Sequence, residues 1–325
     1  MDAVPAAGRQ LGLVPAVTRP APWAFAQEWG GRGWITDIGG GPVHWVEFGG
    51  GDDTPIVFVH GLGGSHLNWV HVAPALATGR RAYALDMRGF GLTPGWPRDT
   101  SIPANVRLLG GFLKEVVCEP VVLVGNSMGG LISATRTADQ SGTVTGLVLV
   151  DPALPPVSRR PDLTVAGLFA TYMLPGIGEF AMRMMQSRST PEEAVQRVIN
   201  LCFADPGRID PRMLAAAVEL AKARAPIRGK EESFLRATRS LMWTLARAEG
   251  HRAVQRRIDV PVLLISGEAD RLVPVAAARQ AAAANPRWDS VFLPGVGHTP
   301  QLETPELVID AVTGWLARTH SSTGR

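Results

Sequence analysis

One stretch decides the fold of this 325-residue chain: VVLVGNSMGG, residues 121–130. Its first four residues are the kind of apolar run that is buried on both faces of a parallel sheet, and a helical pattern follows to about Asp139. A G-x-S-x-G sequence between a strand and a helix is the nucleophile elbow, a sharp turn that exposes a serine hydroxyl. Side chains at Gly125 and Gly129 would collide with that turn. We therefore predict that Ser127 is a nucleophile.

Short β-branched runs alternate with helical stretches on both sides of the elbow, as in a mostly parallel sheet with helices on both faces. We expect strands at 34–38, 43–48, 56–59, 82–85, 121–124, 147–150, 262–265 and 290–293, and helices near 103–117, 127–139, 274–284 and 304–318. The first two strands are separated by Gly39-Gly40-Gly41-Pro42 and are expected to form an antiparallel hairpin.

The alternation stops between residues 152 and 258, where no convincing strand is found. Amphipathic helices are expected there at 163–174, 192–201 and 211–224. We interpret this block as a helical lid over the carboxyl edge of the sheet, where open α/β sheets bind ligands. The expected organisation is an N-terminal arm (1–33), a core (34–151 and 259–319) and the lid (152–258).

A serine hydroxyl needs a base and an orienting carboxylate before it can act as a nucleophile. Of seven histidines, His298 lies in the loop directly after the last expected strand, and Asp270 follows the strand before it. The order Ser127, Asp270, His298 is the one that this architecture uses. Asp151 also ends a strand and is the alternative acid.

The oxyanion of an acyl-transfer reaction needs hydrogen-bond donors. The backbone N–H of Met128, directly after the nucleophile, is one candidate, and the N–H of Leu62 in the loop His60-Gly61-Leu62-Gly63-Gly64 is the other. We interpret His60 as a residue that shapes this loop through local hydrogen bonds.

Five motifs together resemble the α/β-hydrolase superfamily: HGLGG, DMRGFG, GNSMGG, GEADRLVP and GVGHTPQLETPE. The similarity extends over about residues 34–318 and is weakest in the lid. It implies an eight-stranded sheet with a serine triad at its carboxyl edge. Epoxide hydrolases and haloalkane dehalogenases of this superfamily have Asp where Ser127 stands. The GNSMGG form also looks like that of carbon–carbon bond hydrolases, although HGLGGS departs from their Gly/Pro-extended loop.

The lid is rich in methionine and aromatic side chains, which suit irregular apolar pockets. We predict that Tyr172, Met173, Met242 and Trp243 contact an acyl or aryl group, although such side chains also pack lid helices together. No cluster of basic residues marks a carboxylate or phosphate site, so a neutral, small-to-medium carboxylic ester is the expected substrate. The alternatives are carbon–carbon hydrolase, amidase, perhydrolase, lyase or acyltransferase activity on the same triad, or a non-catalytic ligand receptor.

The composition of the chain excludes several classes of protein. Hydrophobic residues make up 46% and charged residues 19% of the chain, which excludes a disordered protein. No apolar run is long enough for a transmembrane helix, and no basic stripe suggests nucleic-acid binding. The two cysteines and seven histidines have no zinc-site spacing, so neither a metal nor another cofactor is expected. The N-terminus lacks the pattern of a secretory signal, and a cytoplasmic location is expected.

Overall fold

Nine strands form one sheet in this computed structural model, which describes residues 17–322 except 24, 96, 140–141 and 158–161. The strand order is β1-β2-β3-β5-β4-β6-β7-β8-β9. The strands are β1 (Thr18–Pro20), β2 (Arg32–Asp37), β3 (Pro42–Gly49), β4 (Asp53–Val59), β5 (Arg80–Leu85), β6 (Val121–Asn126), β7 (Val144–Val150), β8 (Val262–Gly267) and β9 (Asp289–Leu293). Pairs from β1 through β3 to β5 are antiparallel, and those from β5 through β4 to β9 are parallel.

All eight expected strands are present, but the expected number of eight is wrong for the described residues. The additional strand is β1, which comes from the stretch expected to be an N-terminal arm and pairs with β2 through Thr18↔Thr36 and Pro20↔Trp34. Its three exposed residues have no apolar alternation, so no periodicity could reveal them.

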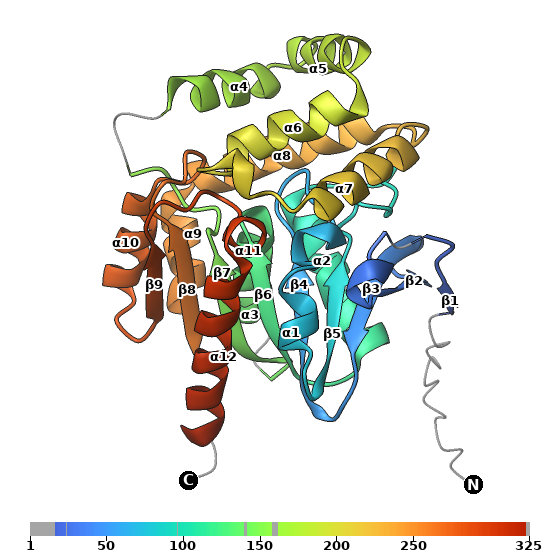
Figure 1. Cartoon of the computed structure of the whole chain (residues 1–325). Helices are drawn as coiled ribbons and strands as arrows, with labels where there is room; N and C mark the ends of the chain where they lie inside the picture. The colour runs from blue at the N-terminus through green and yellow to red at the C-terminus, as the bar shows by residue number, and fades with distance from the viewer. Residues whose placement is uncertain (1–16, 24, 96, 140–141, 158–161, 323–325) are drawn as a thin grey trace, which may run out of the picture.

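The helices are α1 (Ala73–Leu76), α2 (Ile102–Phe112), α3 (Met128–Asp139), α4 (Leu163–Met173), α5 (Ile177–Ser187), α6 (Pro191–Cys202), α7 (Pro211–Arg224), α8 (Lys230–Ala246), α9 (Ala248–Arg256), α10 (Val275–Ala284), α11 (Pro300–Glu303) and α12 (Pro305–Ser322). The π-helix Leu113–Val117 extends α2, and 3-10 turns lie at Gln27–Trp29, His66–Trp69 and Pro206–Arg208. Between β7 and β8 the described residues contain helices and no strand. Figure 1 shows α4 to α8 stacked at one end of the sheet, with α4 and α5 farthest from it.

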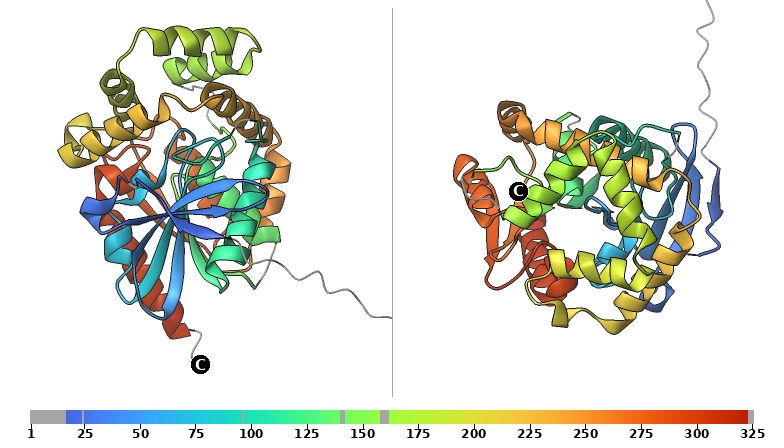
Figure 2. Two further views of the ribbon diagram at one scale, coloured as in Figure 1. Left: turned by 90° about the vertical axis from the view of Figure 1, so that its right-hand side faces the viewer. Right: turned by 90° about the horizontal axis from the view of Figure 1, so that it is seen from above.

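Alternation along the central strands divides the core between the two faces of the sheet. In β6, Leu123 packs in one cluster with Phe112 of α2 and Leu131 of α3. Its neighbour Val122 belongs to the other cluster, with Trp315 of α12. Helices therefore cover both faces, as the views in Figure 2 also show, and the polar residues that follow the strands are left at the carboxyl edge.

Candidate active site

Ser127 forms the sharp turn between β6 and α3. Its φ of +53° lies in the left-handed region, which is strained for a residue with a side chain. Two backbone hydrogen bonds hold the turn: Ser127 N–H donates to the Val150 carbonyl at 3.1 Å, and the Ala153 N–H donates to the Ser127 carbonyl at 2.9 Å. A Cβ on Gly129 would lie 2.1 Å from the Val59 carbonyl oxygen. The helix can thus approach β4 only because residue 129 is glycine.

His298 and Asp270 are in direct contact. His298 Nδ1 lies 2.6 Å from Asp270 Oδ2, and both side chains are buried. Asp270 Oδ1 accepts hydrogen bonds from the backbone N–H groups of Leu272 at 2.7 Å and Val273 at 2.9 Å. Both carboxylate oxygens are therefore occupied, and the imidazole is oriented so that Nε2 is the nitrogen left to exchange a proton.

Asn126 connects the elbow to the histidine loop, a role that the sequence analysis missed. Its side-chain amide donates to the carbonyl of His298 at 3.1 Å and to the carbonyl of Val150 at 3.0 Å. The histidine backbone is thus fixed beside the residue that precedes Ser127. No hydrogen bond joins the Ser127 hydroxyl to the His298 ring within the described residues, and catalytic contacts of this kind often tighten only when substrate binds.

Asp151, the alternative acid, makes different contacts. It is buried at the end of β7 with a φ of +40°, and its Oδ1 accepts hydrogen bonds from the Ser266 hydroxyl at 3.0 Å and the Gly267 N–H at 2.9 Å. Burial, and then the negative charge of Asp270, raise the pKa of Asp151 well above its usual range. The structure therefore places Asp270, and not Asp151, on the histidine.

The loop of residues 60–64 passes directly against Ser127. A Cβ on Gly61 would lie 3.1 Å from the Cβ of Ser127. His60 Nδ1 donates to the Gly61 carbonyl at 2.7 Å, and His60 Nε2 accepts from the Met87 N–H at 3.0 Å. Burial lowers the pKa of His60 to about 4, so the ring is neutral. This confirms that His60 shapes the loop.

One expected oxyanion donor, Met128, follows Ser127 directly in the chain, and the other, Leu62, lies in the loop whose Gly61 contacts Ser127. Met128 is fully buried at the start of α3, where backbone N–H groups have no partner within the helix. Leu62 is half-buried in the loop that contacts the elbow. This arrangement is compatible with an oxyanion site, which stays a prediction for both residues.

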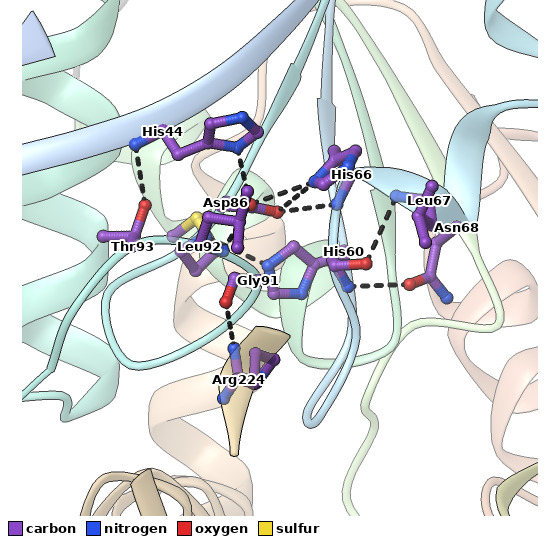
Figure 3. A network of polar contacts seen from close by, with 12 residues as sticks. His44, His60, His66, Leu67, Asn68, Asp86, Gly91, Leu92, Thr93 and Arg224 are labelled. Atoms are coloured by element: carbon purple, nitrogen blue, oxygen red, sulfur yellow. Dashed lines mark hydrogen bonds and ion pairs between the residues drawn. The ribbon is translucent and has the colours of Figure 1, made fainter. Parts of the chain in front are cut away.

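A buried carboxylate, Asp86, fixes the far side of the same loop (Figure 3). It accepts hydrogen bonds from two imidazoles, His44 Nδ1 at 2.8 Å and His66 Nδ1 at 3.0 Å. It also accepts from two backbone N–H groups, that of His66 at 2.7 Å and that of Leu92 at 2.8 Å. Arg224 of α7 donates to the Gly91 carbonyl in the adjoining turn. Asp86 therefore connects β3, the segment that follows the 60–64 loop and the turn after β5.

The cluster His44, His66 and Asp86 also has the composition of a metal site, with ligand atoms within 4.8 Å of one another. However, both Nδ1 atoms are directed at the carboxylate at hydrogen-bond distances, and a bound metal would need those nitrogens deprotonated and about 2.0–2.2 Å from the ion. The half-buried Arg224 guanidinium adds positive charge nearby. We interpret the cluster as hydrogen-bonded support for the loop.

Replacing Asp86 by Asn is expected to lower the free energy of unfolding at pH 7 by about 3–5 kcal/mol, because the donors around it lose a charged acceptor. Burial opposes ionisation of Asp86, but the interactions with His66 and His44 outweigh it and lower its pKa well below the usual range. The ionised form thus stabilises the fold above about pH 4, and this contribution is lost as the pH falls. Urea unfolding of both proteins at pH 7 and below pH 3 measures the difference between them and its loss in acid, and a variant within 1 kcal/mol of wild type at pH 7 would contradict it.

The four residues predicted to contact substrate differ in how far their side chains are exposed. Tyr172 of α4 is buried and packs edge-on against Phe234 of α8, with ring centroids 5.6 Å apart. Met173 is half-buried, and Met242 packs partly against the core. Trp243 is 62% exposed, so in this arrangement its side chain faces solvent, and an enclosed pocket would not include it.

Phe234 is an aromatic contact that the sequence analysis missed. A Cβ on Gly63 would lie 3.3 Å from its ring, and the ring of Phe90 lies edge-on to it at 6.5 Å. Phe234 thus connects the helices between β7 and β8 to the loop that contacts Ser127. Its position in the sequence, among charged residues at the start of a helix, gave no local signal of this role.

Comparison with known proteins identifies the family. A family model described as "Alpha/beta hydrolase family" matches residues 56–311. An acetyltransferase component of the acetoin cleaving system of Pseudomonas putida is 26% identical over 284 residues, 87% of this chain and 68% of that protein. The 2-hydroxy-6-oxo-6-(2'-aminophenyl)hexa-2,4-dienoic acid hydrolase of Metapseudomonas resinovorans is 26% identical over 87% of this chain and 90% of its own length. The sn-1-specific diacylglycerol lipase ABHD11 of Mus musculus is 34% identical over 146 residues, which are 44% of this chain and 46% of that protein.

Solved structures show the same fold. A putative lipase from Acinetobacter baumannii AYE superposes with a TM-score of 0.74 at 21% identity, over 93% of this chain and 98% of that one. The haloalkane dehalogenase DatA from Agrobacterium tumefaciens C58 superposes with a TM-score of 0.76 at 20% identity, over 89% of this chain and 97% of that one. Since the family model matches most of the sequence, and the sheet and elbow have the expected architecture, this chain belongs to the alpha/beta hydrolase family.

Proposed function

We propose that the chain is a serine hydrolase that cleaves a small-to-medium neutral carboxylic ester. The observation that carries the proposal is the 2.6 Å contact between His298 and Asp270, on a loop that Asn126 fixes beside the strained Ser127. Membership of a hydrolase family that includes lipases supports the reaction class.

In the proposed reaction, the Ser127 hydroxyl attacks the ester carbonyl carbon and gives its proton to His298 Nε2. Asp270 keeps Nδ1–H directed at its own carboxylate, which stabilises the imidazolium that forms. The Leu62 and Met128 N–H groups stabilise the negative oxygen of the tetrahedral intermediate. His298 then protonates the leaving alcohol, and water, activated by the same imidazole, releases the acid from the acyl-enzyme.

We assign the helices between residues 152 and 258 to a lid over this site. Tyr172, Met173 and Met242 remain the proposed substrate contacts, whereas Trp243 is left out because its side chain faces solvent. Phe234 is added because it packs on the loop beside Ser127. Of these, Tyr172 and Phe234 have the strongest support, since they form a continuous aromatic contact that reaches the 60–64 loop.

Glu303 is the residue through which this lid acts on the histidine loop. Its buried carboxylate accepts hydrogen bonds from the N–H groups of Gly297 at 2.7 Å, Ala204 at 3.1 Å and Asp205 at 3.0 Å. In addition, the His298 N–H donates to the carbonyl of Cys202, the last residue of α6, at 2.6 Å. The position of the base thus depends on how the end of α6 is held.

Replacing Glu303 by Gln is therefore expected to lower kcat for an ester about 10-fold to 100-fold, because small displacements of a catalytic group have effects of that size. KM should change less than twofold, since Glu303 is buried beneath the histidine loop. Steady-state kinetics measure both constants. The control is Glu306→Gln, an exposed glutamate three residues away that should leave kcat unchanged. Equal kcat values for the two variants would refute this role of Glu303.

A carbon–carbon bond hydrolase is the second candidate. The Metapseudomonas resinovorans hydrolase aligns over most of both chains, and the same serine, histidine and carboxylate could serve either reaction. The candidates differ in the substrate that the lid admits.

The proposal is tested with p-nitrophenyl esters from acetate to palmitate, beside a matched p-nitroanilide and a vinylogous 1,5-diketone. We expect saturable hydrolysis of at least one ester, with slower turnover of the anilide and the diketone. Cleavage of the diketone alone would favour the second candidate, and turnover of none of these compounds would overturn the ester assignment.

A further inference from the structure

The helix pair α4–α5 exposes an unusual amount of apolar surface. Leu163, Leu174, Ile177 and Phe180 are 83%, 50%, 54% and 61% exposed. They account for four of the ten large apolar side chains that are exposed in the described part of the chain. The pair lies at the end of the molecule farthest from the sheet (Figure 1).

Both faces of α4 are apolar. On its inner side, Val165 and Tyr172 are buried, and Tyr172 and Leu168 pack in one cluster with residues of α8 and α5. The outer stripe, three to four residues apart, consists of Leu163, Gly167, Ala170 and Leu174, all exposed. In α5, Met182 is buried and Phe180, two positions away and so on the opposite side of the helix, is exposed. A helix that is apolar all round is normally covered by protein or by lipid.

Length and composition indicate an element that lies on a membrane. No single helix among the described residues is long and apolar enough to span a bilayer. Together α4 and α5 reach that length and apolar content, but they are bent by 114° with respect to each other. Such a bend suits a pair that rests along an interface, with apolar side chains directed into it.

The charges around this surface favour an anionic partner. The sixteen residues from Leu163 to Gly178 contain no charged side chain. Each flanking acid is paired: Asp162 with Arg271 at 2.8 Å, and Glu179 with Arg239 at 2.8 Å. Arg183 and Arg188 of the same pair are exposed, and neither makes an ion pair within the described residues. The uncompensated charge is therefore positive.

We propose that the outer face of α4–α5 docks on the surface of an anionic phospholipid bilayer. Apolar side chains flanked by arginines match the acyl boundary and the headgroup phosphates of such a surface. On its inner side, α4 presents Tyr172 to Phe234 beside the loop at Ser127. Docking would thus place the proposed active site over a lipid ester. That consequence rests on the proposed function, whereas binding to the bilayer does not depend on it.

Vesicle co-sedimentation tests the docking separately from catalysis. The protein carries Ser127→Ala, so that no lipid is hydrolysed, and the vesicles are either phosphatidylcholine alone or an equimolar mixture with phosphatidylglycerol. We expect binding to the mixed vesicles and a loss of at least tenfold in partition with Ile177→Ser/Phe180→Ser. With Arg183→Gln/Arg188→Gln, binding should be about 25-fold weaker, which is about fivefold per arginine. The matched control is Leu307→Ser, which removes an exposed leucine from α12 and should bind as before.

Circular dichroism and thermal unfolding establish that each variant is folded. Two results would overturn the proposal. One is failure of the Ser127→Ala protein to sediment with mixed vesicles, and the other is unchanged binding when Ile177→Ser/Phe180→Ser is added to it. A dimer in solution that this double variant dissociates, without vesicle binding by the parent, would assign the face to a second copy of the chain instead. Vesicle binding with no ester hydrolysis by the wild-type enzyme would leave the docking intact and remove only the proposed function.

Discussion

Replacing Ser127 by Ala is expected to lower kcat for the best p-nitrophenyl ester by about 10⁵-fold to 10⁶-fold, the size of effect that loss of a triad serine has in other hydrolases. The substitution removes the only oxygen that the proposed reaction acylates. The serine side chain is small and lies at the end of a turn held by backbone hydrogen bonds, so the fold should be preserved. Steady-state and single-turnover assays of the purified variant measure the loss.

The matched control for this substitution is Ser133→Ala. Ser133 lies on the same helix, α3, and is buried, and its hydroxyl has no hydrogen-bond partner among the described residues. Its kcat should stay within about twofold of wild type. A Ser127→Ala variant that retains more than about 1% of wild-type kcat, beside an unaffected control, would rule out Ser127 as the nucleophile.

Replacing Asp270 by Asn is expected to lower kcat about 10³-fold to 10⁴-fold near pH 7, as it does for the acid of serine protease triads. An asparagine amide in place of Oδ2 can donate a hydrogen bond, and it then favours the imidazole tautomer that has its proton on Nε2. In that tautomer His298 cannot accept the proton of Ser127. The comparison is made with pH–rate profiles from pH 5 to pH 9.

Asp151→Asn is the same chemical change at the neighbouring carboxyl, and it serves as the control. Because burial and Asp270 raise the pKa of Asp151 well above its usual range, the neutral form is favoured in the fold. The neutral asparagine resembles that form, and kcat should stay within about threefold of wild type. A loss in Asp151→Asn as large as that in Asp270→Asn would assign the orienting acid to Asp151.

The sequence was sufficient to predict eight of the nine strands found among the described residues, because the signals that define those strands are local. Apolar runs such as 56–59 and 121–124 end in glycine-rich turns, and all eight expected strands are found. The helices α5 and α8 were not expected, since their apolar residues are interrupted by charged ones that pair with distant partners. Arg239 of α8 with Glu179 of α5 is one such pair.

The site was predictable only where chain order and motif coincide. Ser127 follows from the elbow alone, whereas Asp270 and Asp151 both follow strands, and only their positions in space show which one contacts His298. The supporting residues Asn126 and Glu303 act across gaps of more than 90 residues. No local pattern encodes such contacts, so the sequence analysis could not identify them.

Labelling with a fluorophosphonate, followed by mass spectrometry of the digested protein, shows whether Ser127 is an activated nucleophile, because this reagent phosphonylates serines that a neighbouring base activates. We expect one adduct per chain, on the peptide that contains Ser127, and little labelling in the Asp270→Asn variant. A folded protein that takes up no reagent at residue 127, or that is modified at another serine while it hydrolyses esters, would contradict this role of Ser127.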